Sequence, residues 1–392
     1  MKYLNSKNFL FASGMVLAMP GIEYFGVSLS YLPCFFSLIY LPSAFTKIPR
    51  SIVLLLSCSF IVFCSEVFFP TSTNYLNSRY RSSTNLINTK FATSNFSENL
   101  ILWLKFSLAV LGGILIVHFA FTKMHEVMLV RGFLFGSLLS VVVGLLTLEQ
   151  GDGFFLQSSG LGRTTTTFGM ICSFSISLTF FTEIRLKFQT QVILIFAMTV
   201  GTLISGSRGA ALTACAALLL ILAWNGRESR VFLLTWLLCV SVLGLYLYGF
   251  QLLERIGVRA FTANRSTFQS NVIREQLRQQ AILDWQYDPI AGVGFSVITQ
   301  GHSTYLQTLA AGGLILFVTY LILDLKSFSI ALECISHRNH VYRLGIVFCI
   351  IFNHFTQNQI DVPFLYLILG IVYYAKRVDV SRTFTQGRSG YV

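Results

Sequence analysis

Long apolar stretches alternate with short polar connections along the whole chain. An apolar stretch of about 17 to 25 residues is long enough to cross the hydrocarbon core of a bilayer as a helix. We therefore expect an all-α integral membrane protein, a polytopic bundle of about 12 transmembrane helices within a range of about 10 to 13. The predicted spans are residues 9–22, 25–45, 51–69, 101–122, 127–149, 167–183, 191–206, 209–225, 231–252, 303–323, 342–358 and 361–375.

Basic residues in the short connections predict how these spans are oriented. Lysines and arginines in short loops stay on the cytoplasmic side of a membrane. Here they fall on every second connection: Lys2, Lys7, Lys47, Arg50, Lys123, Arg185, Lys187, Arg227, Arg230, Lys326, Arg338, Lys376, Arg377, Arg382 and Arg388. Both termini are then cytoplasmic, and three larger segments, residues 70–100, 150–166 and 253–302, lie on the opposite, outer face.

Composition supports a membrane protein without a separate globular module. A soluble globule carries about 25% charged residues, whereas this chain carries 11% and is 54% hydrophobic. We interpret residues 1–392 as a single polytopic membrane domain. The first stretch, Phe9–Gly21, lacks a signal-peptide cleavage site and is followed at once by another apolar segment, so we interpret it as a span. The eight cysteines are scattered without CxxC spacing, which favours packing residues over a zinc or redox site.

The net charge of +12 is partly explained by this orientation and does not indicate nucleic-acid binding. The outer segment 253–302 nevertheless carries arginines and no lysine. The planar guanidinium matches phosphate oxygens bidentately, whereas lysine offers only a point charge. The segment therefore suggests an anionic ligand, although ion pairs with its own carboxylates or with lipid headgroups would explain the arginines equally well.

Two candidate sites flank predicted spans on the outer side. Ser205–Ala210 separates two spans that leave no room for an ordinary loop, so we expect a tight turn with Arg208 at its edge. An ionisable group at membrane depth is costly and is a functional candidate by default, although Arg208 could also snorkel to headgroups. Arg163–Gly169 places four threonines beside an arginine. These hydroxyls could bind a sugar or phosphate, but taken alone they favour a helix N-cap.

Two more candidates lie in and after the large outer segment. Asn264–Asp288 is a polar helix with an irregular apolar stripe, which predicts a helix on the membrane surface. Its Arg274 and Arg278 are one turn apart and share a face. Pro289 should end the helix, before a glycine-rich turn. Next comes His302, which could accept a proton from a hydroxyl or orient it, although a lone histidine is more often structural. His118 and His354 fall within predicted spans.

Several motifs are absent from the sequence. It has no DxD, HExxH, GxSxG or Walker motif and no cluster of metal-ligand spacing. The outer face has few carboxylates, and they are not paired in the sequence. The sequence therefore disfavours ATP use and metal-dependent sugar transfer, and we expect neither a metal nor a cofactor.

Taken together, these segments resemble the superfamily of O-antigen ligases and O-antigen polymerases, bacterial membrane glycosyltransferases that use polyprenyl-linked glycans. The matching segments are, in chain order, Arg163–Gly169, Ser207–Ala210, Arg274 followed by Pro289–Gly294, and His302–Leu309 continuing to Gly313. The resemblance covers roughly residues 160–320, which would form the catalytic region. This sequence departs from the family pattern at Met170–Cys172, Arg278, Ser303 and Leu316. The departures concern the subfamily more than the reaction type.

The resemblance implies a GT-C-like fold in which residues 253–302 form a large periplasmic loop containing short helices. We expect a polysaccharide polymerase of the bacterial inner membrane that transfers an oligosaccharide from a polyprenyl-diphosphate donor to a lipid-linked glycan acceptor on the periplasmic face. The expected catalytic residues are His302, Arg208 and Arg274. The expected substrate-binding residues are Arg163, Arg265, Arg278, Ser303 and Tyr305. A chain-length regulator is a further candidate partner.

Other readings remain open. A ligase would transfer the glycan to lipid A core or to a protein. A flippase for an anionic glycolipid would also use embedded arginines, but such transporters often show inverted repeats, and none is visible in the sequence. A structural membrane protein would need its arginines only to contact headgroups.

Overall fold

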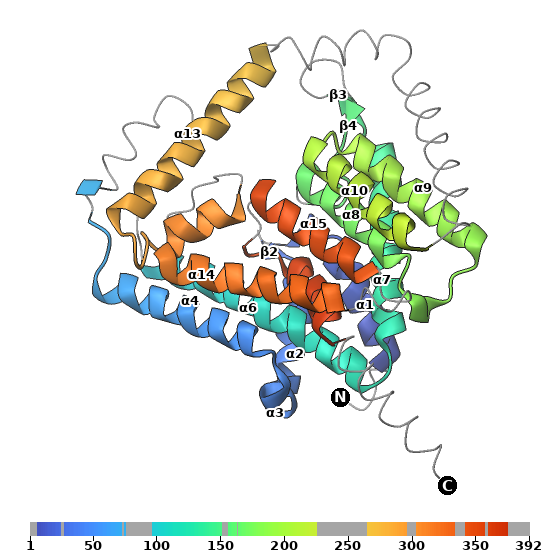
Figure 1. The fold of residues 1–392 in the computed structure, drawn as a ribbon, viewed down its shortest axis with the longest axis horizontal. Helices are drawn as coiled ribbons and strands as arrows, with labels where there is room; N and C mark the ends of the chain where they lie inside the picture. Colours follow the sequence, from blue (N-terminus) through green and yellow to red (C-terminus); the bar gives the residue numbers. More distant parts are fainter. Residues whose placement is uncertain are drawn as a thin grey trace.

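Helices, most of them apolar, make up nearly all of the chain that the computed structural model describes (Figure 1). The described residues are 6–24, 27–72, 74–75, 96–150, 156–162, 164–225, 265–295, 303–333, 342–356 and 360–374. The α-helices are α1 (Ser6–Leu17), α2 (Tyr31–Ser37), α3 (Leu41–Ala44), α4 (Arg50–Phe68), α6 (Phe96–Thr122), α7 (Glu126–Leu146), α8 (Thr165–Leu178), α9 (Phe188–Ile204), α10 (Arg208–Asn225), α13 (Arg265–Tyr287), α14 (Thr304–Glu333), α15 (Tyr342–Thr356) and a C-terminal helix, Pro363–Tyr374.

The short elements lie in connections between these helices. Strands β1 (Glu23–Tyr24) and β2 (Val27–Ser28) pair antiparallel, as do β3 (Glu149–Gln150) and β4 (Leu156–Gln157). Single 3-10 turns are η1 (Leu38–Tyr40), η2 (Phe45–Lys47) and η3 (Thr182–Ile184). The predicted all-α class is therefore confirmed for the described residues, apart from these two small strand pairs.

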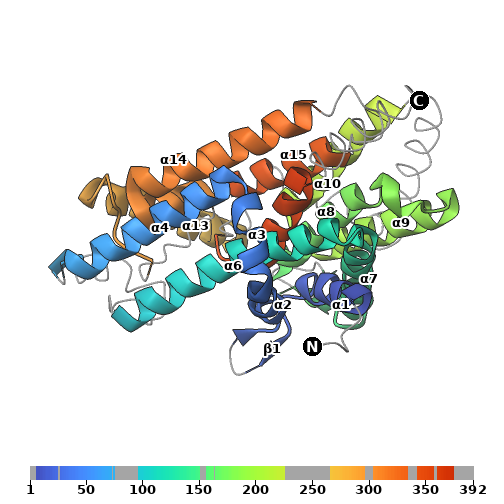
Figure 2. The same cartoon turned by 90° about the horizontal axis from the view of Figure 1, so that it is seen from below.

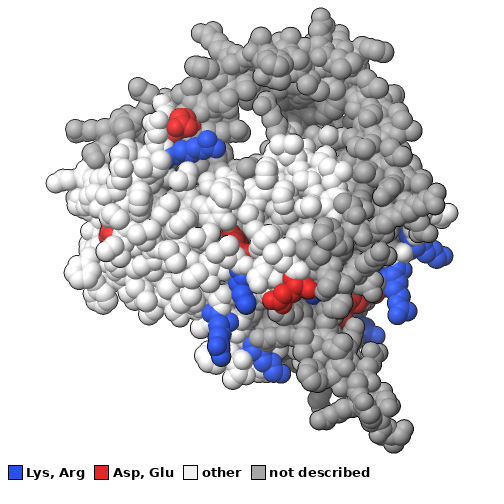
Figure 3. Space-filling model, viewed as in Figure 1, with Lys and Arg blue, Asp and Glu red and all other residues white. Residues whose placement is uncertain are grey.

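The helices identify a multi-pass membrane protein. In the described residues, α4, α7, α14 and the part of α6 from Asn99 are long and apolar enough to cross a membrane. Shorter apolar helices match the predicted spans 167–183, 191–206, 209–225, 342–358 and 361–375. The predicted span 231–252 lies outside the described residues. Figure 3 shows a broad band of this face almost without charge, with most of its charged side chains gathered along the lower edge.

The prediction of one continuous span at residues 25–45 is wrong. The segment consists instead of the β1–β2 hairpin followed by α2, η1, α3 and η2. Pro42 lies at the start of α3, and proline has no N–H to continue the hydrogen-bond pattern of a preceding helix. The chain therefore bends repeatedly here. Cys34 of α2 packs closely against Gly112 and so holds the segment against α6.

The predicted span 303–323 is also not a single straight helix. Within α14, Gly312 and Gly313 have non-helical backbone angles, and the φ of Gly313 is 54°. The hydroxyl of Tyr305 donates to Oδ2 of Asp324 at 2.5 Å, although these residues would be about 28 Å apart along a continuous helix. The first arm (residues 304–311) therefore folds back along the second arm (residues 314–333), and the two form a V in Figure 1.

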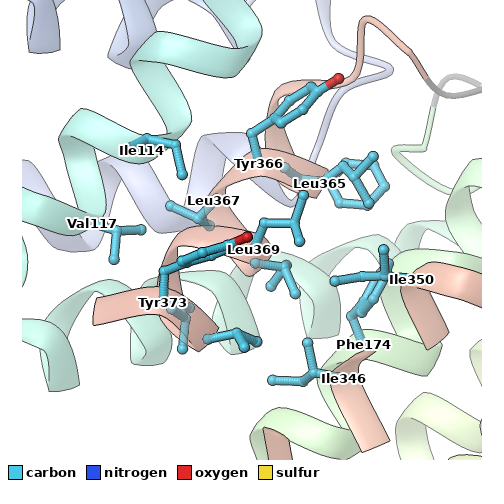
Figure 4. Packing of buried hydrophobic residues seen from close by; sticks show 14 of the residues in the cluster. Ile114, Val117, Phe174, Ile346, Ile350, Leu365, Tyr366, Leu367, Leu369 and Tyr373 are labelled. Atoms are coloured by element: carbon cyan, nitrogen blue, oxygen red, sulfur yellow. The ribbon is translucent and has the colours of Figure 1, made fainter. Parts of the chain in front are cut away.

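The C-terminal helix Pro363–Tyr374 lies at the centre of the main core. It is buried along its whole length, as expected for a helix that is apolar on all sides. Figure 4 shows its side chains between Ile114 and Val117 of α6 on one side and the buried residues of α8 and α15 on the other. Gly113 allows α6 to approach closely, since an added Cβ would lie 2.8 Å from the Leu367 nitrogen.

Small residues set the contact between α1 and α7, which lie along each other in Figure 2. A Cβ on Gly132 would collide with the main-chain oxygen of Phe11, and one on Gly14 would collide with that of Leu129. Glycines spaced in this way let two membrane helices pack backbone against backbone. The same contact fixes the position of α7, and α8 and α9 pack against α7.

Candidate active site

The tight turn predicted between two spans is confirmed. α9 ends at Ile204 and α10 begins at Arg208, with Gly206 at φ 63° between them. The Ser205 hydroxyl accepts from the Ser207 nitrogen at 3.2 Å, and the Ser207 hydroxyl accepts from the Ala210 nitrogen at 3.3 Å. These side chains cap the turn, so the backbone of Arg208 is fixed at the first position of α10.

The threonine-rich segment forms the N-terminus of α8 and contacts this turn. The Thr164 hydroxyl accepts from the Thr167 nitrogen at 3.1 Å, which confirms the N-cap interpretation. A Cβ on Gly169 would lie 2.5 Å from the Ser205 hydroxyl oxygen. The Ser173 hydroxyl donates to the Ala210 carbonyl oxygen at 2.9 Å. Two segments that the sequence singled out separately therefore form one packed unit.

The polar helix α13 ends as predicted, just before Pro289. Its Arg278 is half exposed and lies 3.9 Å from Glu275, an ion pair of the kind considered from the sequence. Such exposed pairs contribute little to stability. The carboxylate of Asp284 is buried and accepts from the Tyr75 hydroxyl at 2.9 Å. This contact ties α13 to the segment that follows α4.

The glycine-rich turn after α13 is joined by backbone hydrogen bonds to the break in α14. The Val293 nitrogen donates to the Ala310 oxygen at 2.8 Å, and the Gly294 nitrogen donates to the Ala311 oxygen at 3.0 Å. In return, the Leu314 nitrogen donates to the Pro289 oxygen at 2.9 Å. The break frees main-chain groups that a buried helix must satisfy, and the Pro289–Gly294 turn satisfies them.

The first arm of α14 begins inside the bundle, beside α15. Ser303 is buried, and its hydroxyl donates to the His354 carbonyl oxygen at 3.1 Å. Tyr305 is 8% exposed, and its hydroxyl lies on Asp324, near the middle of the second arm. Ser303, the residue that follows His302 in the chain, is therefore held against α15.

Helix α15 connects the two parts of the site. It packs against α10, which begins at Arg208, against α8, which contacts the Arg208 turn, and against α14. Of the eight predicted site residues, Arg278, Ser303 and Tyr305 have described side chains. For Arg208, Arg265 and Arg274 the structure gives the helical backbone position only, and Arg163 and His302 lie outside the described residues. Their predicted roles are not tested by these positions.

Two buried residues beside the site were missed as candidates by the sequence reasoning. Asp324 is 2% exposed and His354 is fully buried, with 2.7 Å between Oδ2 and Nδ1. A carboxylate in the middle of an apolar helix was the signal available, because an ionisable group in a membrane span is costly and is usually kept for a function. Within the described residues, no group of three or more His, Cys, Asp or Glu could hold a metal ion.

Comparison with known protein families identifies the family of the part of the chain that contains most of this site. Residues 193–321 match the O-antigen ligase family, from within α9 to the second arm of α14. The chain carries an O-antigen ligase domain. It is thus a membrane glycosyltransferase of the O-antigen ligase and polymerase type, as the sequence resemblance predicted, and this family acts on lipid-linked glycans. No curated protein matches the chain.

The ligase domain contains the Arg208 turn, α13, the Pro289–Gly294 turn and the break in α14. Helices α8 and α15 lie outside the matched stretch but hold its parts together. The O-antigen ligase domain is therefore completed by elements from both sides of it in the chain.

Proposed function

We propose that this protein is a polysaccharide polymerase of the bacterial inner membrane. It transfers an oligosaccharide from a polyprenyl-diphosphate donor to a lipid-linked glycan acceptor on the periplasmic face. In this reaction an acceptor hydroxyl attacks the anomeric carbon, the bond to the diphosphate breaks, and polyprenyl diphosphate leaves. Both termini are cytoplasmic in this proposal. The reaction needs stabilisation of the negative charge on the leaving group and a partner for the hydroxyl proton.

One observation carries the proposal. Arg208 begins a helix fixed by a capped turn, and the helix bearing Arg274 ends in a turn that is hydrogen-bonded to α14. Pre-positioned cations stabilise developing charge because they need not reorganise during the reaction. Arg208 and Arg274 are therefore proposed to stabilise the diphosphate, with Arg163, Arg265 and Arg278 binding it and its sugar.

His302 is proposed to contact the acceptor hydroxyl, as a general base or as an orienting hydrogen-bond partner. It directly precedes Ser303, whose hydroxyl anchors the start of the first arm to α15. A group acting on a proton must be held within hydrogen-bond reach of it. Ser303 and Tyr305 would support the substrate from the same arm.

Transfer to lipid A core or to a protein is the second candidate, because the matched family is that of O-antigen ligases. Polymerisation is preferred because the outer loop, residues 253–302, is of modest length. Deleting the gene separates the two. A lost polymerase leaves single repeat units on the carrier and the cell surface, whereas a lost ligase leaves long chains on the carrier.

The site is tested by complementing the deletion strain with Arg208→Ala, Arg274→Ala or His302→Ala. Each should lower the rate of chain growth by about two to four orders of magnitude. Lys123→Ala removes an exposed charge in the connection between α6 and α7 and is the matched control. A full wild-type glycan ladder from both Arg208→Ala and His302→Ala would show that the site is assigned wrongly.

The proposed orientation has its own test. Cysteines introduced as Arg265→Cys and His302→Cys should react with a membrane-impermeant thiol reagent added from the periplasmic side. Replacing the exposed Cys215 by serine first lowers the background. Labelling of either position from the cytoplasm alone would refute the orientation.

A further inference from the structure

A buried pair of ionisable residues joins the two helices that follow the site. Asp324 lies on the second arm of α14 and His354 in the last turn of α15. Oδ2 of Asp324 is 2.7 Å from Nδ1 of His354. This hydrogen bond between the carboxyl oxygen and the ring nitrogen fixes the orientation of the imidazole ring.

The same pair holds the beginning of the first arm. The Tyr305 hydroxyl donates to the Asp324 oxygen that also binds His354. The Ser303 hydroxyl donates to the main-chain oxygen of His354. The Tyr305 ring stands edge-on to the His354 ring, with 5.8 Å between the centroids. Two of the three residues that follow His302 are therefore attached to the pair.

Other residues confine the pair closely. The ring of Tyr320 lies edge-on to His354, with 5.8 Å between centroids, on the second arm. The Tyr320 hydroxyl is hydrogen-bonded to that of Tyr366 in the C-terminal helix. The imidazole is thus enclosed by aromatic rings. A displacement of Asp324 or His354 would therefore also displace the first arm.

Stability alone does not account for the pair. Among the described residues, Oδ1 of Asp324, Nε2 of His354 and Oε1 of Gln307 are buried without a hydrogen-bond partner. Replacing a buried ionic pair by apolar residues is often neutral or stabilising, and buried polar atoms that lack partners add a further cost. A fold selected only for packing would gain from Leu at positions 324 and 354.

We propose that Asp324 and His354 are positioning residues that, through Tyr305 and Ser303, set the place of His302 against the acceptor hydroxyl. The pair itself contacts no substrate. This inference rests on the proposed role of His302. It assigns to the Tyr305 hydroxyl a role in orientation; direct support of substrate by Tyr305, as proposed above, is the competing role that the test separates from it.

The test measures kcat and KM of the purified full-length protein in lipid nanodiscs, using lipid-linked oligosaccharide extracted from the deletion strain. Asp324→Asn and Tyr305→Phe should each lower kcat by about 10- to 100-fold, the size of effect expected from a small misplacement of a reacting group. KM should change by less than about twofold. Loss of substrate binding by Tyr305 would instead raise KM, and that result would overturn the positioning role.

A double substitution tests whether the two groups act together. If both act through one hydrogen bond, Tyr305→Phe adds little to the loss caused by Asp324→Asn, whereas independent effects would multiply. Tyr374→Phe is the matched control. Tyr374 is also a buried tyrosine, and its hydroxyl donates to the Lys47 main-chain oxygen at 3.2 Å, away from the site. It should leave kcat unchanged.

The combined variant Asp324→Leu with His354→Leu separates position from stability. It should unfold at the wild-type temperature or above, because the pair is costly, and should still lose kcat. Full kcat in a folded Asp324→Asn protein would overturn the inference. So would an equal loss from Asp324→Asn in a His302→Ala background, since a positioning residue acts only through His302. Full activity of His302→Ala alone would instead refute the proposed function.

Discussion

Gly313 provides the most direct test of how the site is built. Its φ of 54° with ψ of −154° lies in a region that residues with a side chain avoid. A Cβ placed there would collide with the Ile290 carbonyl and lie 2.8 Å from the Ala291 nitrogen. Gly313→Ala must therefore either shift the Pro289–Gly294 turn or straighten the break.

The size of the effect follows from these contacts. The backbone strain costs about 1 to 3 kcal/mol. Displacing the turn also endangers the hydrogen bonds of Leu314 to Pro289 and of Ile315 to Ile290, at 2.9 and 3.3 Å. Each is worth about 1 kcal/mol net. We therefore expect a loss of about 2 to 5 kcal/mol, which would lower the unfolding temperature by several degrees.

The assay is thermal unfolding in detergent, followed by the glycan ladder in the deletion strain. Gly144→Ala is the matched control, because Gly144 lies within helix α7 and its Cβ would meet only side-chain atoms, the nearest at 3.1 Å. The control should keep its unfolding temperature and its ladder. If Gly313→Ala matched the wild type in both measurements, the fold-back of α14 would be refuted.

Three further predictions test other parts of the structure. Gly132→Leu should strongly destabilise the protein, by more than about 3 kcal/mol, because the side chain would be driven into the Phe11 main chain; thermal unfolding measures this. Thr164→Ala removes the cap of α8 and should cost about 1 kcal/mol while leaving the glycan ladder intact. Arg278→Ala should leave the unfolding temperature unchanged, since its pair with Glu275 is exposed, but should raise KM if Arg278 binds substrate.

The sequence pattern predicted the helix ends correctly where nearby residues determine them. The start of α8 at a threonine cap, the tight α9–α10 turn and the end of α13 before Pro289 were all predicted and are confirmed. Each depends on residues within a few positions, through side-chain caps or the missing N–H of proline. The O-antigen ligase domain was predicted on the same local motifs.

The fold-back of α14 could not be predicted in this way. Two glycines in an apolar stretch are compatible with a straight membrane helix. The break forms because the Pro289–Gly294 turn supplies partners for the main-chain groups that it frees. Those partners come from another part of the chain. The hydrophobic pattern of residues 303–323 alone therefore could not predict the break.

By itself, the sequence determined that this is a helical membrane protein with an O-antigen ligase domain, because hydrophobicity and short motifs act locally. Only the tertiary structure decided that the start of the first arm lies beside His354 and that Asp324 holds it there. Tyr305 and Asp324 would be distant on a straight helix. Their contact requires the chain to reverse, and the reversal is stabilised by a turn that no local pattern specifies.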